Sequence, residues 1–180
     1  MTNLIIIQAR ANSSRLPKKI LMRLEGKSIL EHIINFSKFS KLSDKIIVAT
    51  TTNSEDNAVE NICNKLDVAC FRGSSENVLE RFYECSKLFH GDIIVRLTAD
   101  NPLIDPELVD DVIKKSIDTK CDYATNMLSN TFPHHGYLAE AMSFNILKQL
   151  YNTKKDPLSE EHITYDLRIN HTSYHVEHIR

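Results

Sequence analysis

Three cationic side chains follow an apolar stretch close to the start of the chain. Arg10, Arg15 and Lys19 come directly after the apolar run at residues 4–7, at spacings of five and four residues. Guanidinium groups bind phosphate oxygens in bidentate fashion, and a lysine ammonium binds them as a mobile point charge. On a loop that wraps a ligand, three such donors can converge on one triphosphate. A solvated basic loop explains the same residues, and composition alone leaves the two interpretations about even.

An acidic turn follows a second apolar stretch. Residues 93–98 read Ile-Ile-Val-Arg-Leu-Thr, and Asp100 comes two residues later. A carboxylate at the end of a strand can hold a magnesium ion that bridges to phosphate oxygens. Taken alone, Asp100 is better interpreted as the cap of a turn before Pro102. Beside a cationic loop at the same edge of a sheet, the magnesium interpretation is favoured.

Several familiar signatures are missing from the sequence. It contains no Gly-x-Gly-x-x-Gly fingerprint, no P-loop, no Ser/His/Asp triad signature and no Cys-x-x-Cys pair. The scattered cysteines are expected to be reduced structural thiols. If residues 172–179 form a strand, His171 and His175 face one side and His178 the other, so the three do not converge on a metal. The chemistry therefore depends on the cations and Asp100.

The positions of these side chains depend on an alternation of strands and helices. Apolar, β-rich runs at residues 4–7, 45–51, 68–72 and 92–98 are separated by segments of helical period. This order predicts an α/β fold, with a mostly parallel sheet and helices on its faces. Open sheets of this kind bind ligands at the carboxyl ends of their strands. The cationic loop and Asp100 are therefore expected at one crevice.

Local signals predict where the helices begin. Ser28 and Glu31 form a capping box, and Asp105 precedes a proline at the first position of another helix. In the second half the pattern predicts a short strand around Tyr123, a helix near residues 145–151, another around His162, and a closing strand at residues 172–179.

Size and charge limit the class of protein. The 180 residues carry a formal net charge of −2 and a pI of about 6.4. One domain over residues 1–180 is expected. The cations form no basic shell, which argues against nucleic acid as a partner. No apolar stretch is long enough to cross a membrane and the first residues lack a charged leader, so a cytoplasmic protein is expected.

At this point the residues resemble a known family. The motifs are Gln8-Ala-Arg10, Ser14-Arg15-Leu-Pro17, Lys19, Ile47-Val-Ala-Thr50, Phe71-Arg-Gly73, Val78-Leu79 with Arg81, Arg96-Leu-Thr-Ala-Asp100 with Pro102, Asp122-Tyr123 with Asn126, and Glu161-His162-Ile-Thr164. In this order they resemble the cytidylyltransferases of surface-sugar synthesis. The spore-coat polysaccharide type, related to acylneuraminate and 3-deoxy-manno-octulosonate cytidylyltransferases, matches best.

The resemblance implies a three-layer, Rossmann-like nucleotide-diphospho-sugar transferase fold with helices on both faces of the sheet. It implies transfer of a cytidylyl group from CTP to a sugar or sugar-acid acceptor, release of pyrophosphate, and Mg2+ as cofactor. A homodimer is possible by the same analogy.

The resemblance also assigns roles to residues of this chain. Arg10, Arg15, Lys19 and Asp100 would be catalytic, and Asp100 would bind the metal. Asn126, Glu140 and His162 would lie near the acceptor. The nucleotide would contact Gln8, Ala9, Arg10, Arg15, Lys19, Thr50, Arg72, Gly73, Ser74, Arg81, Thr98 and Ala99.

Four departures from the family pattern bear on these roles. Lys18 replaces a glycine and is expected to face water, Asn77 replaces an aspartate and is expected to keep its capping role, and Leu138 replaces an aspartate near the acceptor. The chain is also expected to lack the family's C-terminal segment, which carries a second metal ligand. A catalytically weak or inactive nucleotide-binding or assembly subunit is therefore the alternative. A glycosyltransferase is disfavoured because Asp100-Asn-Pro lacks an Asp-x-Asp motif.

Overall fold

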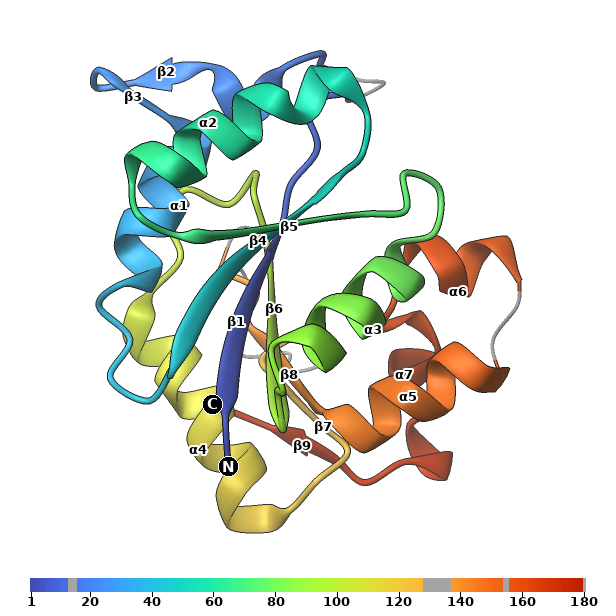
Figure 1. Cartoon of the computed structure of the whole chain (residues 1–180). Helices are drawn as coiled ribbons and strands as arrows, with labels where there is room; N and C mark the ends of the chain where they lie inside the picture. Colours follow the sequence, from blue (N-terminus) through green and yellow to red (C-terminus); the bar gives the residue numbers. More distant parts are fainter. Residues whose placement is uncertain (13–15, 128–136, 154–155, 180) are drawn as a thin grey trace.

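The computed structural model describes residues 1–12, 16–127, 137–153 and 156–179, which form a sheet covered by helices on both faces (Figure 1). Seven strands form this sheet in the order β5-β4-β1-β6-β8-β7-β9. Their bounds are β1 Asn3–Gln8, β4 Lys45–Thr51, β5 Ala69–Gly73, β6 Ile93–Thr98, β7 Tyr123–Thr125, β8 Glu140–Ser143 and β9 Val176–His178. A small hairpin of β2 (Arg23–Leu24) and β3 (Lys27–Ser28) lies apart from it.

The helices divide between the two faces of the sheet. Their bounds are α1 Ile29–Ser37, α2 Asn57–Lys65, α3 Val78–Leu88, α4 Pro106–Thr119, α5 Phe144–Thr153, α6 Pro157–Glu161 and α7 Tyr165–Ile169. One buried cluster packs α1, α2 and α4 on the sheet, and a second packs α3, α5 and α7 on the opposite face. This arrangement confirms the three-layer, mostly parallel α/β fold expected from the sequence.

The helix starts confirm the capping signals. The Ser28 hydroxyl accepts from the Glu31 amide at 3.2 Å, and the Glu31 carboxylate accepts from the Ser28 amide at 2.6 Å. Asp105 caps α4 ahead of the proline. Asn77 caps α3 by accepting from the amide of Glu80 at 2.8 Å, so its expected capping role is confirmed.

The second half of the chain differs from the sequence prediction in three places. Strand β8 runs antiparallel between β6 and β7, and no pattern in the sequence indicated it. His162 lies after the end of α6, and the helix expected around it is instead two short helices. The closing strand is confined to Val176–His178 and follows a 3-10 turn at His171–Ser173. The polar residues of these short segments give weak periodicity, because few apolar side chains mark the buried face.

The topology creates a crevice between β1 and β6. The chain passes from β1 through β4 to β5 on one side, and then returns to β6 on the other side of β1. The strand order reverses between β1 and β6, which is called a topological switch point. The connections there leave the sheet in opposite directions, so a ligand crevice opens beyond the carboxyl ends of the strands. The cationic loop follows β1 and Asp100 follows β6. In the part of the chain that the structure describes, no helix is long and apolar enough to span a membrane.

Candidate functional site at the switch point

The crevice contains a pocket of about 290 Å³. Its walls come from the ends of β1 and β6, from the cationic loop and from the connection between α6 and α7. The lining residues are Gln8, Arg10, Lys19, Ile20, Arg96, Thr98, Ala99, Asp100, Glu161 and His162. The strand register explains part of this set, because Gln8 lies opposite Thr98 on neighbouring parallel strands. Residues far apart in sequence therefore share one polar pocket.

Lys19 and Asp100 meet across the pocket. The Lys19 ammonium donates to a carboxylate oxygen of Asp100 at 2.7 Å, and both side chains are partly exposed. Burial raises the pKa of Asp100, but hydrogen bonds from Lys19 and Thr98 outweigh it and hold the pKa below its ordinary value. The carboxylate is therefore ionised near neutral pH. The structure brings together two residues that the sequence analysis placed in the loops after two separate strands.

Arg10 reaches toward the opposite wall. Its guanidinium lies 3.7 Å from the Glu161 carboxylate, and both side chains are about half exposed. Arg10 also lines a second pocket of about 340 Å³, whose other walls include Asn12, Asn53 and Glu76. One cation thus borders two adjacent pockets, an arrangement that suits an elongated anionic ligand. Arg15 lies outside the described residues.

The second pocket is shaped by a buried carboxylate. Asp56 accepts from the Ala11 amide at 2.6 Å and from both the amide and the hydroxyl of Thr51. These bonds tie the loop after β1 to the loop after β4. Sequence reasoning gave Asp56 no role, and only its position just after a β-strand could have suggested one.

Arg72 organises the same loop. Its guanidinium donates to the backbone oxygens of Thr51 and Asn53, to the Asn57 side chain, and to Glu60 at 2.8 Å. These four contacts use most of its donors. The structure places Arg72 as a brace beneath the second pocket, with few donors left for a nucleotide.

Arg81 is completely buried beneath the turn after β5. Its Nη1 donates to the Ser74 carbonyl, while its Nε and Nη2 have no partner among the described residues. Burial and the nearby charge of Arg10 lower the pKa of Arg81 to about 10. Gly73 makes room for it, since a Cβ there would approach the Arg81 Cγ to 3.1 Å and the Phe71 ring to 2.8 Å. A buried guanidinium with unused donors is costly unless a ligand completes it.

The remaining residues expected to bind nucleotide lie around the strand ends. Thr98 and Ala99 line the first pocket, while Ala9 and Thr50 are buried. The Thr50 hydroxyl has no partner among the described residues. Lys18 is exposed to water, as expected, and has a left-handed backbone with φ of 58°, a conformation that glycine adopts most readily.

The three residues expected near the acceptor lie in different surroundings. His162 is exposed at the rim of the pocket. Asn126 is buried, donates to the Tyr137 carbonyl at 2.7 Å and accepts from the Ala139 amide at 3.2 Å, so it braces a loop. Glu140 is also buried and pairs with Arg96. Arg96 had no role in the sequence analysis, although an arginine in an apolar strand is a signal that could have identified it.

A magnesium ion fits the chemistry of this pocket only together with a substrate. Asp100 is the one carboxylate supplied by a strand end there, and no group of three metal-ligating side chains occurs in the part of the chain described. Mg2+ is typically held by one or two carboxylates, water and substrate phosphates. The donor set therefore matches an ion that arrives with a triphosphate.

Comparison with known proteins shows which family this chain is similar to. The sequence profile described as "Cytidylyltransferase" matches residues 4–179. The uncharacterized protein MJ1063 of Methanocaldococcus jannaschii is 42% identical over 88% of this chain and 64% of its own length. The spore coat polysaccharide biosynthesis protein SpsF of Bacillus subtilis is 35% identical over 97% of this chain and 73% of its own.

Two further similarities concern a more distant enzyme and a solved structure. The 3-deoxy-manno-octulosonate cytidylyltransferase of Pelodictyon phaeoclathratiforme is 36% identical over 61% of this chain and 44% of its own length. The structure of a cytidylyltransferase from Leptospira borgpetersenii superposes with a TM-score of 0.94 at 31% identity, covering 99% of this chain and 76% of that one. The chain thus spans less than two thirds of the length of MJ1063 and less than half that of the octulosonate enzyme.

Proposed function

This chain belongs to the cytidylyltransferase family, and from that membership we propose that it transfers the cytidylyl group of CTP to a hydroxyl of a sugar or sugar acid. The acceptor oxygen attacks the α-phosphorus, the bond from that phosphorus to the β-phosphate bridging oxygen breaks, and pyrophosphate leaves. The acceptor hydroxyl gives up its proton to solvent water. Surface polysaccharide synthesis is the proposed setting, by similarity to SpsF.

The observation that carries the proposal is the convergence of Arg10, Lys19 and Asp100 at the switch point. Transfer of a nucleotidyl group needs an in-line geometry and neutralisation of the charge that builds on the leaving oxygens. Arg10 and Lys19 supply positive charge to the triphosphate from one loop. Both cations are paired with carboxylates in the free protein, and these ion pairs hold them at the pocket. A bound polyanion would compete with the carboxylates for the two cations.

Asp100 is the proposed magnesium ligand. Asp100 would hold the ion, and Mg2+ would then neutralise charge on the leaving pyrophosphate. The lowered pKa of Asp100 keeps a negative oxygen at the pocket, and the Lys19 ammonium balances that charge. The second pocket, bordered by Arg10 and braced by Asp56 and Arg72, is the proposed place for the nucleoside.

The experiment is a pyrophosphate-release assay with CTP, Mg2+ and 3-deoxy-manno-octulosonate as the first acceptor. Lys19→Met and Asp100→Asn are each expected to lower kcat by roughly 100-fold or more, because each removes charge aimed at the transferred group. Lys27→Met, at an exposed residue of β3, is the matched control and is expected to keep wild-type rates. Wild-type rates in both pocket variants contradict the proposal. CTP binding without turnover of any acceptor supports a noncatalytic nucleotide-binding subunit instead.

A further inference from the structure

Two of the four cysteines lie on neighbouring elements at the edge of the sheet. All four are free thiols, and Cys63, Cys85 and Cys121 are buried. Cys70 is partly exposed, because it lies on β5, the edge strand of the sheet. Cys63 lies in the last turn of α2, the helix beside β5 (Figure 1). Cys70 is therefore the cysteine most open to a reagent from solvent.

The chain reversal after α2 brings the two cysteines to the same layer. The Val68 amide donates to the Cys63 carbonyl at 3.0 Å, and Asp67 has a left-handed backbone with φ of 53°. This is the hydrogen bond of a Schellman cap, which ends the helix and turns the chain back. Side chains alternate along an extended chain, so Val68 and Cys70 face the same side. Both pack against the buried cluster that contains Cys63, whereas Phe71 packs in the cluster on the opposite face.

A second set of contacts fixes the register of α2 on β5. Arg72, two residues after Cys70, donates to Asn57 at 2.7 Å and to Glu60 at 2.8 Å. Glu60 and Cys63 are three residues apart, so they lie on the same face of the helix. Cys70 and Arg72 likewise lie on one face of the strand. Because Glu60 meets Arg72, Cys63 at the next helical turn lies beside Cys70.

The surroundings of Cys70 favour its thiolate. Hydrogen bonding with Cys63 is the main cause that lowers the pKa of the Cys70 thiol, and the charge of Arg72 acts in the same direction. Burial and the carboxylates of Glu60 and Asp56 oppose this shift. The same hydrogen bond and burial raise the pKa of Cys63, so the proton stays on the buried sulfur. An accessible thiolate beside a protonated thiol is the arrangement of cysteine pairs that react with peroxides.

We propose that Cys70 is a modification site for hydroperoxides and that Cys63 converts the product into a disulfide. With hydrogen peroxide, the Cys70 thiolate attacks one oxygen and the O–O bond breaks. Cys70 is oxidised to a sulfenic acid, and the leaving hydroxide takes a proton from solvent to become water. The Cys63 sulfur then attacks the Cys70 sulfur and the S–O bond breaks. The Cys63 thiol proton leaves with the sulfenic hydroxyl as a second water, and the disulfide remains.

The cross-link would act on the second pocket through Arg72. Glu60 and Asn57, which hold Arg72, belong to the same helix as Cys63. The two sulfurs are not bonded in this structure, so a bond of about 2 Å draws the last turn of α2 toward β5. That movement disturbs the contacts that brace the pocket. Oxidation is therefore expected to weaken CTP binding several-fold, a consequence that rests on the proposed function.

The test maps the disulfide in the reduced full chain after treatment with hydrogen peroxide and alkylation of the remaining thiols. Trypsin cuts after Lys65, so a disulfide between Cys63 and Cys70 joins the peptides 46–65 and 66–72. We expect this linked pair under non-reducing conditions and its loss on reduction. Cys85 and Cys121 are expected to be oxidised at least about tenfold more slowly, because they are buried. The wild type alone gives this result, so it does not depend on the folding of a variant.

Substitutions separate the roles of the two thiols. Cys63→Ala is expected to accumulate a sulfenic acid on Cys70, which dimedone traps, and to form no disulfide. Cys70→Ala is expected to lose both products. Cys121→Ala, at a buried cysteine outside the pair, is the matched control and is expected to form the disulfide at the wild-type rate. Calorimetry with CTP then compares reduced and oxidised wild type with Cys70→Ala treated in the same way.

Each outcome has a defined meaning. Absence of the linked peptides, faster oxidation of Cys85 or Cys121, or a disulfide between two chains overturns the modification site. A disulfide that leaves the CTP affinity unchanged overturns its effect on the second pocket. A reduced wild type that does not bind CTP overturns the proposed function instead, and the peptide map still decides whether Cys70 is the modification site.

Discussion

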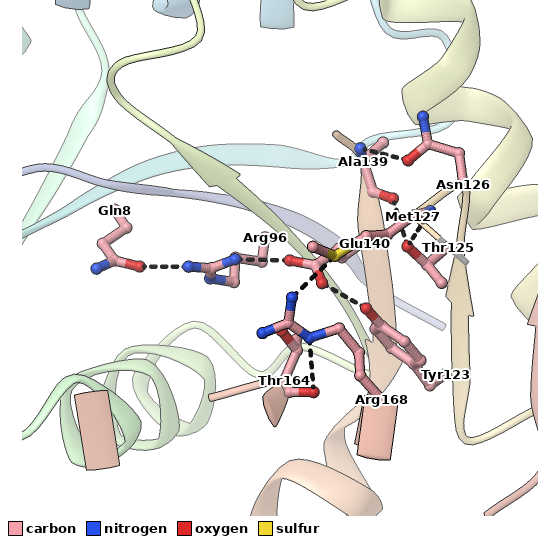
Figure 2. A network of polar contacts seen from close by, with 10 residues as sticks. All are labelled: Gln8, Arg96, Tyr123, Thr125, Asn126, Met127, Ala139, Glu140, Thr164 and Arg168. Atoms are coloured by element: carbon pink, nitrogen blue, oxygen red, sulfur yellow. Dashed lines mark hydrogen bonds and ion pairs between the residues drawn. The ribbon is translucent and has the colours of Figure 1, made fainter. Parts of the chain in front are cut away.

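The Glu140 carboxylate shows how a single buried residue beside the site can affect the stability of the protein. It is fully buried, and it pairs with Arg96, which lines the pocket (Figure 2). Glu140→Ala is expected to lower the free energy of unfolding by about 3 kcal/mol, because it leaves a mostly buried guanidinium without a counter-ion. Urea unfolding measures this change. Glu84→Ala, which removes an exposed partner of Lys87, serves as the control and is expected to stay within about 0.5 kcal/mol. Equal effects of the two substitutions on the free energy of unfolding would show that the buried ion pair contributes no more to stability than the exposed one.

Arg81 leads to the opposite expectation for stability. Its buried guanidinium donates one hydrogen bond to the Ser74 carbonyl, and two of its nitrogens have no partner in the described part of the chain. Arg81→Met keeps much of the packing and removes an incompletely satisfied charge, so the free energy of unfolding is expected to change by less than about 1 kcal/mol or to rise. CTP affinity, measured by calorimetry, is expected to fall at least about tenfold. A large loss of stability with unchanged CTP affinity would make Arg81 a purely structural residue.

At the scale of elements, the start of α1 gives a prediction with a pH dependence. The Ser28 amide and then the Lys65 ammonium lower the pKa of Glu31 from 4.5 to about 2. A lowered folded-state pKa contributes stability above the unfolded value, and this contribution is lost as the pH falls through about 4.5 toward 2. Glu31→Gln keeps the capping geometry without the charge.

The measurement for α1 is chemical unfolding at pH 7, 4.5 and 2.5. The difference in stability between wild type and Glu31→Gln is expected to shrink as the solution becomes more acidic. Ser28→Ala, which removes the cap itself, is expected to cost about 1 kcal/mol at every pH. A difference between wild type and Glu31→Gln that stays constant with pH would contradict the assigned role of the carboxylate.

The elements also show what the sequence could predict. The strand at Lys45–Thr51 and the helix starts at Ser28 and Asp105 follow from local apolar patterns and caps, and the structure confirms them. The antiparallel β8 could not be predicted, since its four residues carry little pattern and its pairing with β6 depends on distant contacts. The same holds for the site. The proximity of Lys19 and Asp100 could be predicted because parallel strands end at one edge of the sheet. The pairing of Glu140 with Arg96 could not, because it depends on the register of β8.

At the scale of the whole molecule, the two pockets at the switch point lie beside the connections between strands far apart in sequence. A ligand that fills both is expected to stabilise the folded protein as a unit. At a CTP concentration about 100 times Kd the stabilisation is about 2.7 kcal/mol, which raises the Tm of a domain of this size by about 5–10 °C. Differential scanning fluorimetry with ATP at the same concentration is the control. An equal shift with ATP would show binding of phosphate without selection of the base.

The central claim is that the chain transfers the cytidylyl group of CTP to an acceptor hydroxyl. The most direct measurement is ³¹P NMR of a mixture of the protein, CTP, Mg2+ and 3-deoxy-manno-octulosonate. The account predicts loss of the triphosphate signals and growth of one signal from a CMP phosphodiester together with that of pyrophosphate, and no such change with Asp100→Asn. Unchanged CTP in the presence of the folded, CTP-binding wild type, or hydrolysis to CMP without a new diester, would contradict it.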